Sequence, residues 1–386
     1  MESPLPNIYA PYREDAEAQH RYSLRHRHSV VAHPRYADPF ELDVEDLQIT
    51  FDSAWSPYIQ GSITAKAGDE ASLAALDPRA GCRVHVFAGY VYDGMVDDVH
   101  LLADLHVRER KVNRPDNTVT LTVSSDEALA EDYKRLAWGP HASTSGMTPF
   151  VQFHADRASI PDTATVRSDY GYDLGADDIA GMVQDVGQDS LSMLQDAAER
   201  VGVRVYVDGD RTWRIAPLPE YSGATALKLF TGPEGTILDA AATLTRGAVD
   251  GHGFHNAVSI KYLWKDSGGV DRVNFGNAVV ASGPYAPSAI GYNVLYLERP
   301  YAVASTAKAN QAAANVLKPL VGRGHQVELG AHAAYWLRPG HTVTVQLPAG
   351  GQERHLVRSV SFHPLTGRMD LGLVQPINVT ISTSSG

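Results

Sequence analysis

The chain has 386 residues, of which 44% are hydrophobic and 20% are charged. This length gives room for two or three domains, and the composition excludes a disordered chain, a nucleic-acid-binding tail and a long coiled coil. The net charge of −12 opposes sequence-independent binding to phosphate backbones, because Lys and Arg supply most of that affinity. Cys82 is the only cysteine, which excludes an internal disulfide, a CxxC redox site and a thiolate zinc site.

The first residues lack the basic start and apolar run of a signal peptide, so the sequence predicts no secretion. The longest uncharged run lies between Arg272 and Glu298, and it contains Pro and Asn residues that a spanning helix could not accommodate. We therefore expect no transmembrane segment. Residues 1–40 are interpreted as an N-terminal arm.

Residues 41–125 alternate apolar and polar positions in short runs, which is the period of β-strands. The run that starts at Val84 ends at Asp93-Gly94, a typical hairpin turn, and Met95 to Val107 is the expected return strand. Alternation resumes over 117–123, after the break RPDN. This segment predicts a first small antiparallel β-barrel or sandwich.

Residues 126–240 change to a helical period and predict an α+β middle domain. Asp126 is the expected N-cap of a short helix, and residues 139–149 are expected to form a loop. Two helices are predicted between Gly175 and Gly202, the second capped by Asp189 or Ser190 and ended by Gly202. The hairpin VRVYV-DGDR-TWRIA follows.

Residues 241–376 predict a second β-barrel domain interrupted by one helix, which Ser305 or Thr306 would cap and Pro319 would end. Its closing strands are HTVTVQL, RHLVRSVSF and RMDLGLV. Residues 377–386 are expected to be a flexible tail. The predicted fold is thus mainly β, with two small antiparallel β-barrels or sandwiches flanking a helix-plus-hairpin domain.

Four histidines lie close together in the most basic stretch of the chain, at His20, His26, His28 and His33. Neutral imidazole is a common zinc or iron ligand, but Arg25 and Arg27 beside them would oppose a cation. A solvated arm, or a contact with an acidic partner, explains the 20–33 stretch as well.

Ten acidic residues against three basic ones lie between positions 150 and 200. Asp169, Asp173, Asp177 and Asp178 could build a calcium site or a paired-carboxylate glycosidase centre, with Tyr170 and Tyr172 as platforms for sugar rings. Acidic residues also gather at helix N-termini because they cap free amides, and this is the simpler interpretation of residues 169–178.

The sequence Asp266-Ser267-Gly268-Gly269 is similar to the nucleophile loop of chymotrypsin-like proteases. The flanking residues differ from that motif, however, and no upstream histidine segment would supply a base. A hairpin turn between two alternating runs is the expected structure.

The order of these parts resembles a family. VHVFAGYVYDGMVDD with NTVTLTVSSDEALAEDY, SLSMLQDAAERVGVRVYVDGDRTWRIAP, NAVSIKYLW with TAKANQAAANVLKPL, and WLRPGHTVTVQLP with HLVRSVSFHPLTGRMDLGLVQP are similar, in this order, to segments of the tail-hub or baseplate-hub proteins of long-tailed bacteriophages, the minor tail proteins of siphophages. The resemblance covers most of residues 41–376. His341 stands where Asp is common in that family.

The resemblance implies a homotrimeric ring in the virion tail tip, made in the bacterial host cytoplasm. Such a ring joins the tail tube, or a distal tail protein, to the tape measure or the tip or spike protein, and lets DNA pass through its lumen. It implies no catalytic residue, no cofactor, no metal and no membrane insertion. Two alternatives remain open: a receptor- or cell-wall-glycan-binding tail protein, and a cell-wall hydrolase with Asp173 and Asp177 as the first pair to test.

Overall fold

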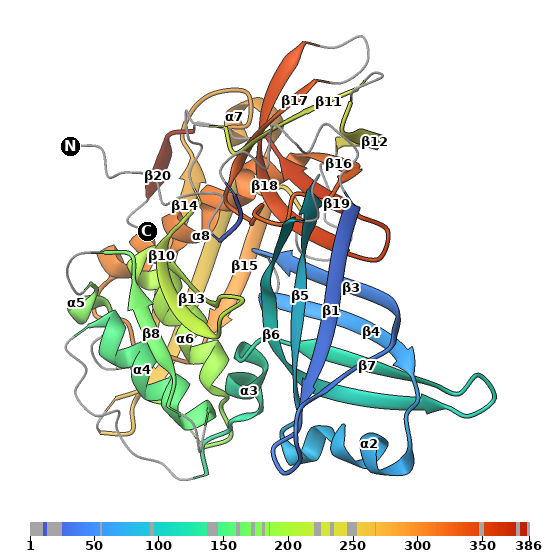
Figure 1. Cartoon of the computed structure of the whole chain (residues 1–386). Helices are drawn as coiled ribbons and strands as arrows, with labels where there is room; N and C mark the ends of the chain where they lie inside the picture. The colour runs from blue at the N-terminus through green and yellow to red at the C-terminus, as the bar shows by residue number, and fades with distance from the viewer. Residues whose placement is uncertain are drawn as a thin grey trace.

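The computed structural model describes residues 11–13, 25–54, 56–92, 96–136, 146–159, 163–170, 174–179, 182–184, 186–219, 225–231, 235–244, 253–266, 268–346, 351–375 and 379–383. The chain is mainly β, with helices concentrated in the middle of the sequence and one long helix after it (Figure 1). The predicted fold class is therefore confirmed.

The first β unit covers residues 25–124. Along its strands the apolar residues alternate inward, as Val119, Leu121 and Val123 do, and are buried. The predicted break at RPDN is a turn, closed by a hydrogen bond from the Asn117 amide to the Arg114 carbonyl, whereas the predicted Asp93-Gly94 turn lies outside the described residues. The elements are β1 (Arg25–His33), β2 (Phe40–Glu41), β3 (Val44–Asp52), β4 (Ile59–Lys66), α2 (Glu70–Ala75), η1 (Pro78–Ala80), β5 (Arg83–Tyr92), β6 (Val96–Asn113) and β7 (Thr118–Ser124).

The N-terminal segment differs from the prediction. Residues 25–33, expected to belong to an arm, form β1, which pairs antiparallel with β5 over its whole length. Val30 and Ala32 face inward and are fully buried, and this apolar alternation holds the strand in the sheet. Tyr12 is also buried, and its hydroxyl donates to the Ala88 carbonyl at 2.9 Å.

The second β unit is hydrogen-bonded to the first. Strand β18 pairs antiparallel with β3, from Ser359 opposite Asp52 to Phe362 opposite Ile49, so that both units form one 13-stranded sheet. The strand order of the described residues is an open path. The three predicted closing strands are confirmed. The elements of this unit are β11 (Leu227–Phe230), β12 (Ile237–Leu244), β16 (His325–His332), β17 (Thr342–Gln346), β18 (Gln352–His363) and β19 (Arg368–Val374).

The middle unit has its own core, in which Phe150, Met193 and Trp213 are buried. The predicted second helix is confirmed: the Asp189 carboxylate accepts from the Ser192 amide at 2.7 Å, and Gly202 ends the helix with φ of 81°. The predicted hairpin is confirmed as well. The elements are α3 (Glu127–Asp132), α4 (Met147–Ala158), β8 (Thr165–Ser168), α5 (Ala176–Ile179), α6 (Ser190–Val201), β9 (Val203–Val207) and β10 (Thr212–Pro217).

A four-stranded sheet with a third core completes the chain. Helix α8 covers one face of this sheet, and Gly276 permits the close approach, because a Cβ there would lie 2.1 Å from the Ala309 carbonyl oxygen. Ser305 caps α8 as predicted, while Pro319 lies in the last turn and does not end it. The elements are β13 (Ala257–Lys265), β14 (Asp271–Val280), α7 (Pro287–Ile290), β15 (Val294–Arg299), α8 (Thr306–Leu320), the short turn η2 (Val321–Gly324) and β20 (Ile381–Thr383).

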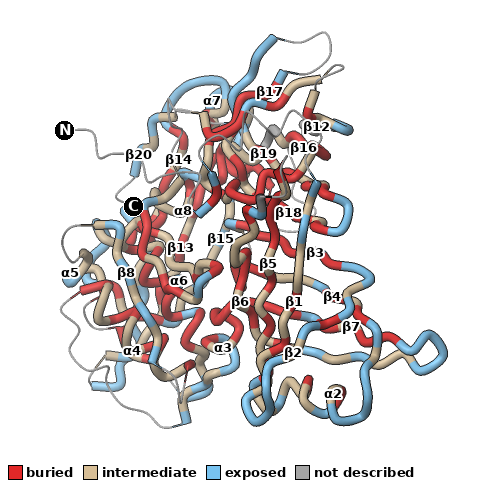
Figure 2. Tube along the Cα trace, in the orientation of Figure 1, coloured by how far each residue is buried: buried red, intermediate tan, exposed pale blue. Residues whose placement is uncertain are grey.

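These elements bear on two further expectations. Strands from residues 241–376 contribute to two sheets, the large one and the four-stranded one, and the domain boundaries stay a prediction. The prediction that residues 377–386 form a flexible tail is wrong for Ile381–Thr383, because this segment forms β20 and pairs with β14. Figure 2 shows buried segments along the inner strands and along α6 and α8, which is where the three cores lie.

Candidate functional site: a charged junction between units

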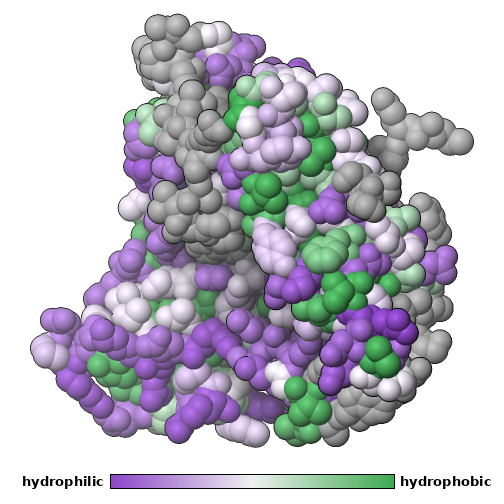
Figure 3. All heavy atoms as spheres, turned by 180° about the vertical axis from the view of Figure 1, so that it is seen from behind, coloured by the Kyte–Doolittle hydropathy of each residue, from purple (hydrophilic) through white to green (hydrophobic). Residues whose placement is uncertain are grey.

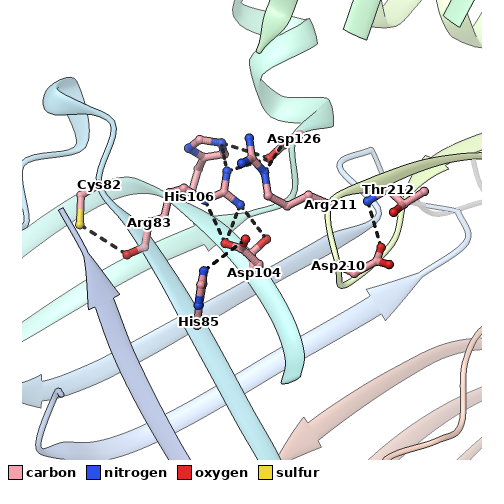
Figure 4. Close-up of polar contacts among 9 residues, drawn as sticks. All are labelled: Cys82, Arg83, His85, Asp104, His106, Asp126, Asp210, Arg211 and Thr212. Atoms are coloured by element: carbon pink, nitrogen blue, oxygen red, sulfur yellow. Dashed lines mark hydrogen bonds and ion pairs between the residues drawn. The ribbon is translucent and has the colours of Figure 1, made fainter. Parts of the chain in front are cut away.

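The middle unit meets the first β unit through a cluster of charged side chains (Figure 4). Asp126 is at its centre, with a side chain that is only 3% exposed. One of its oxygens lies 3.0 Å from His106 Nε2 on β6, and the other lies 3.1 Å from Arg211 Nε in the β9–β10 turn. Arg83 Nη1, on β5, is 3.7 Å from the same carboxylate. The cluster therefore connects three segments that are far apart in the sequence.

Asp126 does not perform the capping role that the sequence predicted. It precedes α3, but its carboxylate makes no capping hydrogen bond to that helix. Burial by itself raises the pKa of Asp126, yet the close contact with His106 and the charges of Arg211 and Arg83 together lower it below the usual value. The cations of the junction thus hold this buried carboxylate in its charged form.

A second carboxylate extends the network along β6. Asp104 accepts from Arg83 Nε at 2.9 Å and lies 3.3 Å from His85 Nε2. Arg83 therefore lies between Asp104 and Asp126. Burial is the main reason why the pKa of His85 is below its ordinary value.

The backbone of the middle unit approaches β6 closely at this point. The Asp104 amide donates to the Gly209 carbonyl at 2.8 Å, and a Cβ on Gly209 would lie 2.4 Å from the Leu102 oxygen. The Asp210 carboxylate accepts from the Thr212 amide, while Arg211 adopts φ of 65°, a left-handed conformation that is uncommon outside glycine. This turn directs Arg211 toward Asp126.

Glu127, the next residue after Asp126, is a buried tie between the same units. Its Oε1 accepts from the Val207 amide at 2.7 Å and from the Tyr58 amide at 3.4 Å. Burial raises the pKa of Glu127 to about 7. The Glu127 carboxylate therefore accepts from two backbone amides, and its burial costs it the hydration that it would have in water.

A similar network joins the middle unit to the four-stranded sheet. Asp196 on α6 lies 2.8 Å from Arg200 and 3.5 Å from Arg299 on β15, and Arg299 also pairs with Glu199 at 2.9 Å. Burial raises the pKa of Asp196 to about 6 despite these cations. Both boundaries of the middle unit are thus formed by buried ion pairs.

Local sequence patterns do not single out the residues of this charged junction. Arg83 and His85 alternate with apolar residues on β5, and Asp104 and His106 do the same on β6. That spacing places charged side chains on one face of adjacent strands, and it is the signal that could have found the network. Which acidic residue faces which cation depends on the pairing of β5 with β6 and on the distant turn at Arg211.

The histidine cluster of the sequence is dispersed in the structure, and His20 lies outside the described residues. His26 Nδ1 is 3.2 Å from the Tyr335 hydroxyl, and burial lowers the pKa of His26 to about 4. Burial also lowers the pKa of His28, and the ring of His33 contacts the ring of His85 in a tilted arrangement, with centroids 3.7 Å apart. In the part of the chain that the structure describes, no three His, Cys, Asp or Glu residues are grouped so as to hold a metal ion.

The acidic candidates also lie apart. Asp169 is 3.9 Å from Arg214, and Asp178 is 2.7 Å from Lys308 of α8. Asp177 is exposed in α5. Tyr170 packs against the core of the middle unit, while Tyr172 and Asp173 lie outside the described residues. Among the described residues the structure therefore brings no two of these carboxylates together.

The protease-like sequence forms a turn, as predicted. Asp266 Oδ1 accepts from the amides of Gly268 and Val270, and its Oδ2 accepts from Arg272. Ser267 lies outside the described residues. Cys82 is buried, and burial raises the pKa of its thiol to about 11, which makes the thiolate scarce at neutral pH. None of the described helices is long and apolar enough to span a membrane.

No protein-family model matches the chain, and no curated protein sequence matches it. Solved structures do match. The tail protein from Neisseria meningitidis MC58 aligns with 90% of this chain and 96% of its own, at 12% identity and a TM-score of 0.59. The 43 kDa tail protein of prophage MuSo2 from Shewanella oneidensis aligns with 90% of this chain and 98% of its own, at 16% identity and a TM-score of 0.58.

The chain shares the fold of these two tail proteins. A weaker match, with a TM-score of 0.50 and 8% identity, is the Francisella PdpA-VgrG complex, in which 95% of this chain aligns with 61% of the matched chain. The two tail-protein matches each cover 90% of this chain, so the similarity of fold is not confined to one unit.

Proposed function

We propose that this protein is a structural component of a phage tail, a hub ring of three copies that joins the tail tube to the tip or spike and allows DNA to pass. One observation carries the proposal: two tail proteins match this chain over nearly their whole lengths. A match confined to one unit would support only a shared module, because small β units serve unrelated functions.

The surface supports a role in assembly. On the four-stranded sheet, the face opposite α8 exposes Val273 by 52%, Phe275 by 46% and Tyr296 by 52%. The rear view in Figure 3 shows hydrophobic residues in patches on the side of the molecule that this sheet occupies. Exposed apolar side chains gathered on one face are typical of protein contacts. Other tail proteins are the partners that we propose.

The net charge of −12 fits a channel that DNA crosses without binding, since acidic walls repel phosphate. We propose that the face lining the lumen is net acidic. A map of charge on the assembled ring tests this point, and a basic lumen would contradict it.

The first test is the native mass of the purified protein over a concentration series. A trimer, or a hexamer of two stacked trimers, is the expected result, and electron microscopy should then show a ring. A chain that stays monomeric at every concentration, and also in the presence of purified tail tubes, would contradict the hub.

The same preparation tests the alternatives. Glycan binding predicts retention on host cell-wall fragments, and hydrolysis predicts turnover that is lost in Asp177→Asn. For the hub we expect neither. Dialysis against a chelator should leave the melting temperature unchanged, because we propose that assembly stabilises the fold without a metal.

A further inference from the structure

Among the described residues, two of the donor atoms of Arg204 have no hydrogen-bond acceptor. Arg204 lies on β9, and its Nε and Nη1 atoms are buried and make no hydrogen bond. Its guanidinium lies 4.5 Å from the centre of the Tyr206 ring. No described carboxylate forms an ion pair with it. A buried donor that is left unpaired costs free energy that a bound acceptor would restore.

A second arginine, Arg338, acts on the same neighbours as Arg204, because both guanidinium groups influence the pKa values of His341 and Tyr58. The Arg338 guanidinium donates to the carbonyls of Tyr335 and Leu337 and stacks on aromatic rings. Desolvation, together with the charges of Arg338 and Arg204, lowers the pKa of His341 to about 4, so its ring is neutral. Among the described residues no carboxylate pairs with Arg338 either. Two guanidinium groups that form no described ion pair thus lie near the same residues, in a chain whose net charge is −12.

Arg204 lines a cleft of about 420 Å³ between α6, β9 and the turn that joins β3 to β4. This volume is in the range of specific ligand sites. The cleft walls combine aliphatic residues of α6 with two tyrosine rings. Two carboxylates also line it: Glu199 is paired with Arg299 at 2.9 Å, and Glu127 has one oxygen, Oε2, without a hydrogen bond. The cleft thus offers a guanidinium donor, a free acceptor and an apolar wall.

We propose that this cleft binds an acidic peptide segment of a partner protein. The side-chain carboxylate of the segment binds the Arg204 guanidinium, and a backbone N–H of the segment donates to Glu127 Oε2. An adjacent apolar side chain packs on Leu191 and Leu194. A peptide carries all three groups on one short chain, whereas a simple carboxylate ion satisfies only the arginine. The inference does not depend on the hub proposal.

Titration of the full chain with two matched peptides tests this site. The probes are N-acetyl-Leu-Glu-amide and N-acetyl-Leu-Gln-amide, which differ only in the charge of one side chain. We expect the Glu peptide to bind about 10-fold to 100-fold more tightly, the range for a hydrogen bond to a charged group. Arg204→Met should abolish this preference. Arg354→Met removes the same charge from an exposed position and should preserve it.

Three results would overturn the proposal: equal binding of both peptides, an Arg204→Met variant that keeps the preference, and hexanoate binding as tightly as the Glu peptide. The last result would assign the cleft to free carboxylates. If the melting temperature shows that Arg204→Met does not fold, Arg204→Lys replaces it in the titrations. It keeps the charge but loses the paired donors, and it should retain only part of the preference.

Discussion

At the seam between β3 and β18 the two β units share a ladder of backbone hydrogen bonds and one apolar core. The middle unit meets β5 and β6 mainly through charged side chains, with one backbone hydrogen bond from Asp104 to Gly209. At the seam, the ring of Phe362 packs against the rings of Phe51 and Tyr335, with centroids 6.1 and 5.4 Å apart. At the charged junction, Asp126 is surrounded by His106, Arg83 and Arg211.

The two kinds of boundary respond to different conditions. Burial of apolar surface does not depend on pH, so the seam should hold the β units together as one body. A buried ion network depends on the protonation of every member and loses much of its stabilisation when one member is removed. The middle unit is therefore the part of the molecule whose attachment can be changed by pH.

The largest effect is expected at the seam. Phe362→Ala should destabilise the protein by about 3–5 kcal/mol, the usual cost of a cavity at a buried phenylalanine. Because both β units share this core, urea denaturation should show one transition that moves as a whole. Tyr36→Ala, at a position that is 83% exposed, is the matched control and should have little effect. Separate transitions for the two β units would contradict a shared core.

A smaller and pH-dependent effect is expected at the charged junction. Asp126→Asn should cost about 3 kcal/mol at pH 7, because Arg83 and Arg211 lose a buried counter-ion. The pKa of Asp126 is lowered in the folded state, so its contribution is present above the usual pKa and is lost as the pH falls below about 4. Wild type and variant should therefore converge at acidic pH.

Denaturation curves at pH 7 and pH 3 measure this convergence. Asp43→Asn breaks an ion pair with Lys66 in which both side chains are more than half exposed, and it should change stability little at either pH. A difference between Asp126→Asn and wild type that is the same at both pH values would contradict the ionic account of the junction.

Much of the fold follows from local patterns in the sequence. The alternation at Val119, Leu121 and Val123 predicts β7, and Asp189 with Gly202 predicts the limits of α6. The segments that were missed have weak local signals. Strand β1 carries Arg25, His26, Arg27 and His28, and such a basic stretch predicts a solvated arm. Its strand structure depends on the pairing with β5, which lies far away in the sequence. Helix α4 begins at Met147, which lies inside the segment 139–149 that the sequence predicts to be a loop.

The charged junction could not be predicted from local patterns. Asp126 fits the pattern of a helix N-cap, and nothing near it in the sequence indicates that Arg211, 85 residues away, would bind it instead. The environment of Arg204 could not be predicted from local patterns either, because an arginine on a predicted strand is ordinarily expected to reach solvent. Such sites depend on which units meet, and this information is contained in the tertiary structure.

Glu127 allows the sharpest test of the junction, although the expected effect is the smallest. Its pKa is raised from 4.5 to about 7 in the folded state, so its contribution is present below pH 4.5 and is lost as the pH rises through 7. Glu127→Gln keeps an oxygen that accepts from the Val207 amide but carries no charge. Relative to wild type, we expect the variant to gain about 1–3 kcal/mol between pH 5 and pH 8.

Urea denaturation at these two pH values measures the gain, and Glu45→Gln, at an exposed position, should follow wild type at both. A parallel pH dependence for Glu127→Gln and wild type would show that Glu127 titrates in the folded protein as it does in the unfolded chain. The effects at Asp126 and Glu127 should have opposite signs, since cations surround the first carboxylate, whereas neutral donors, the Ser125 hydroxyl and backbone amides, hold the second. Neighbouring residues at one boundary would then respond to pH in opposite directions, which a purely apolar contact could not produce.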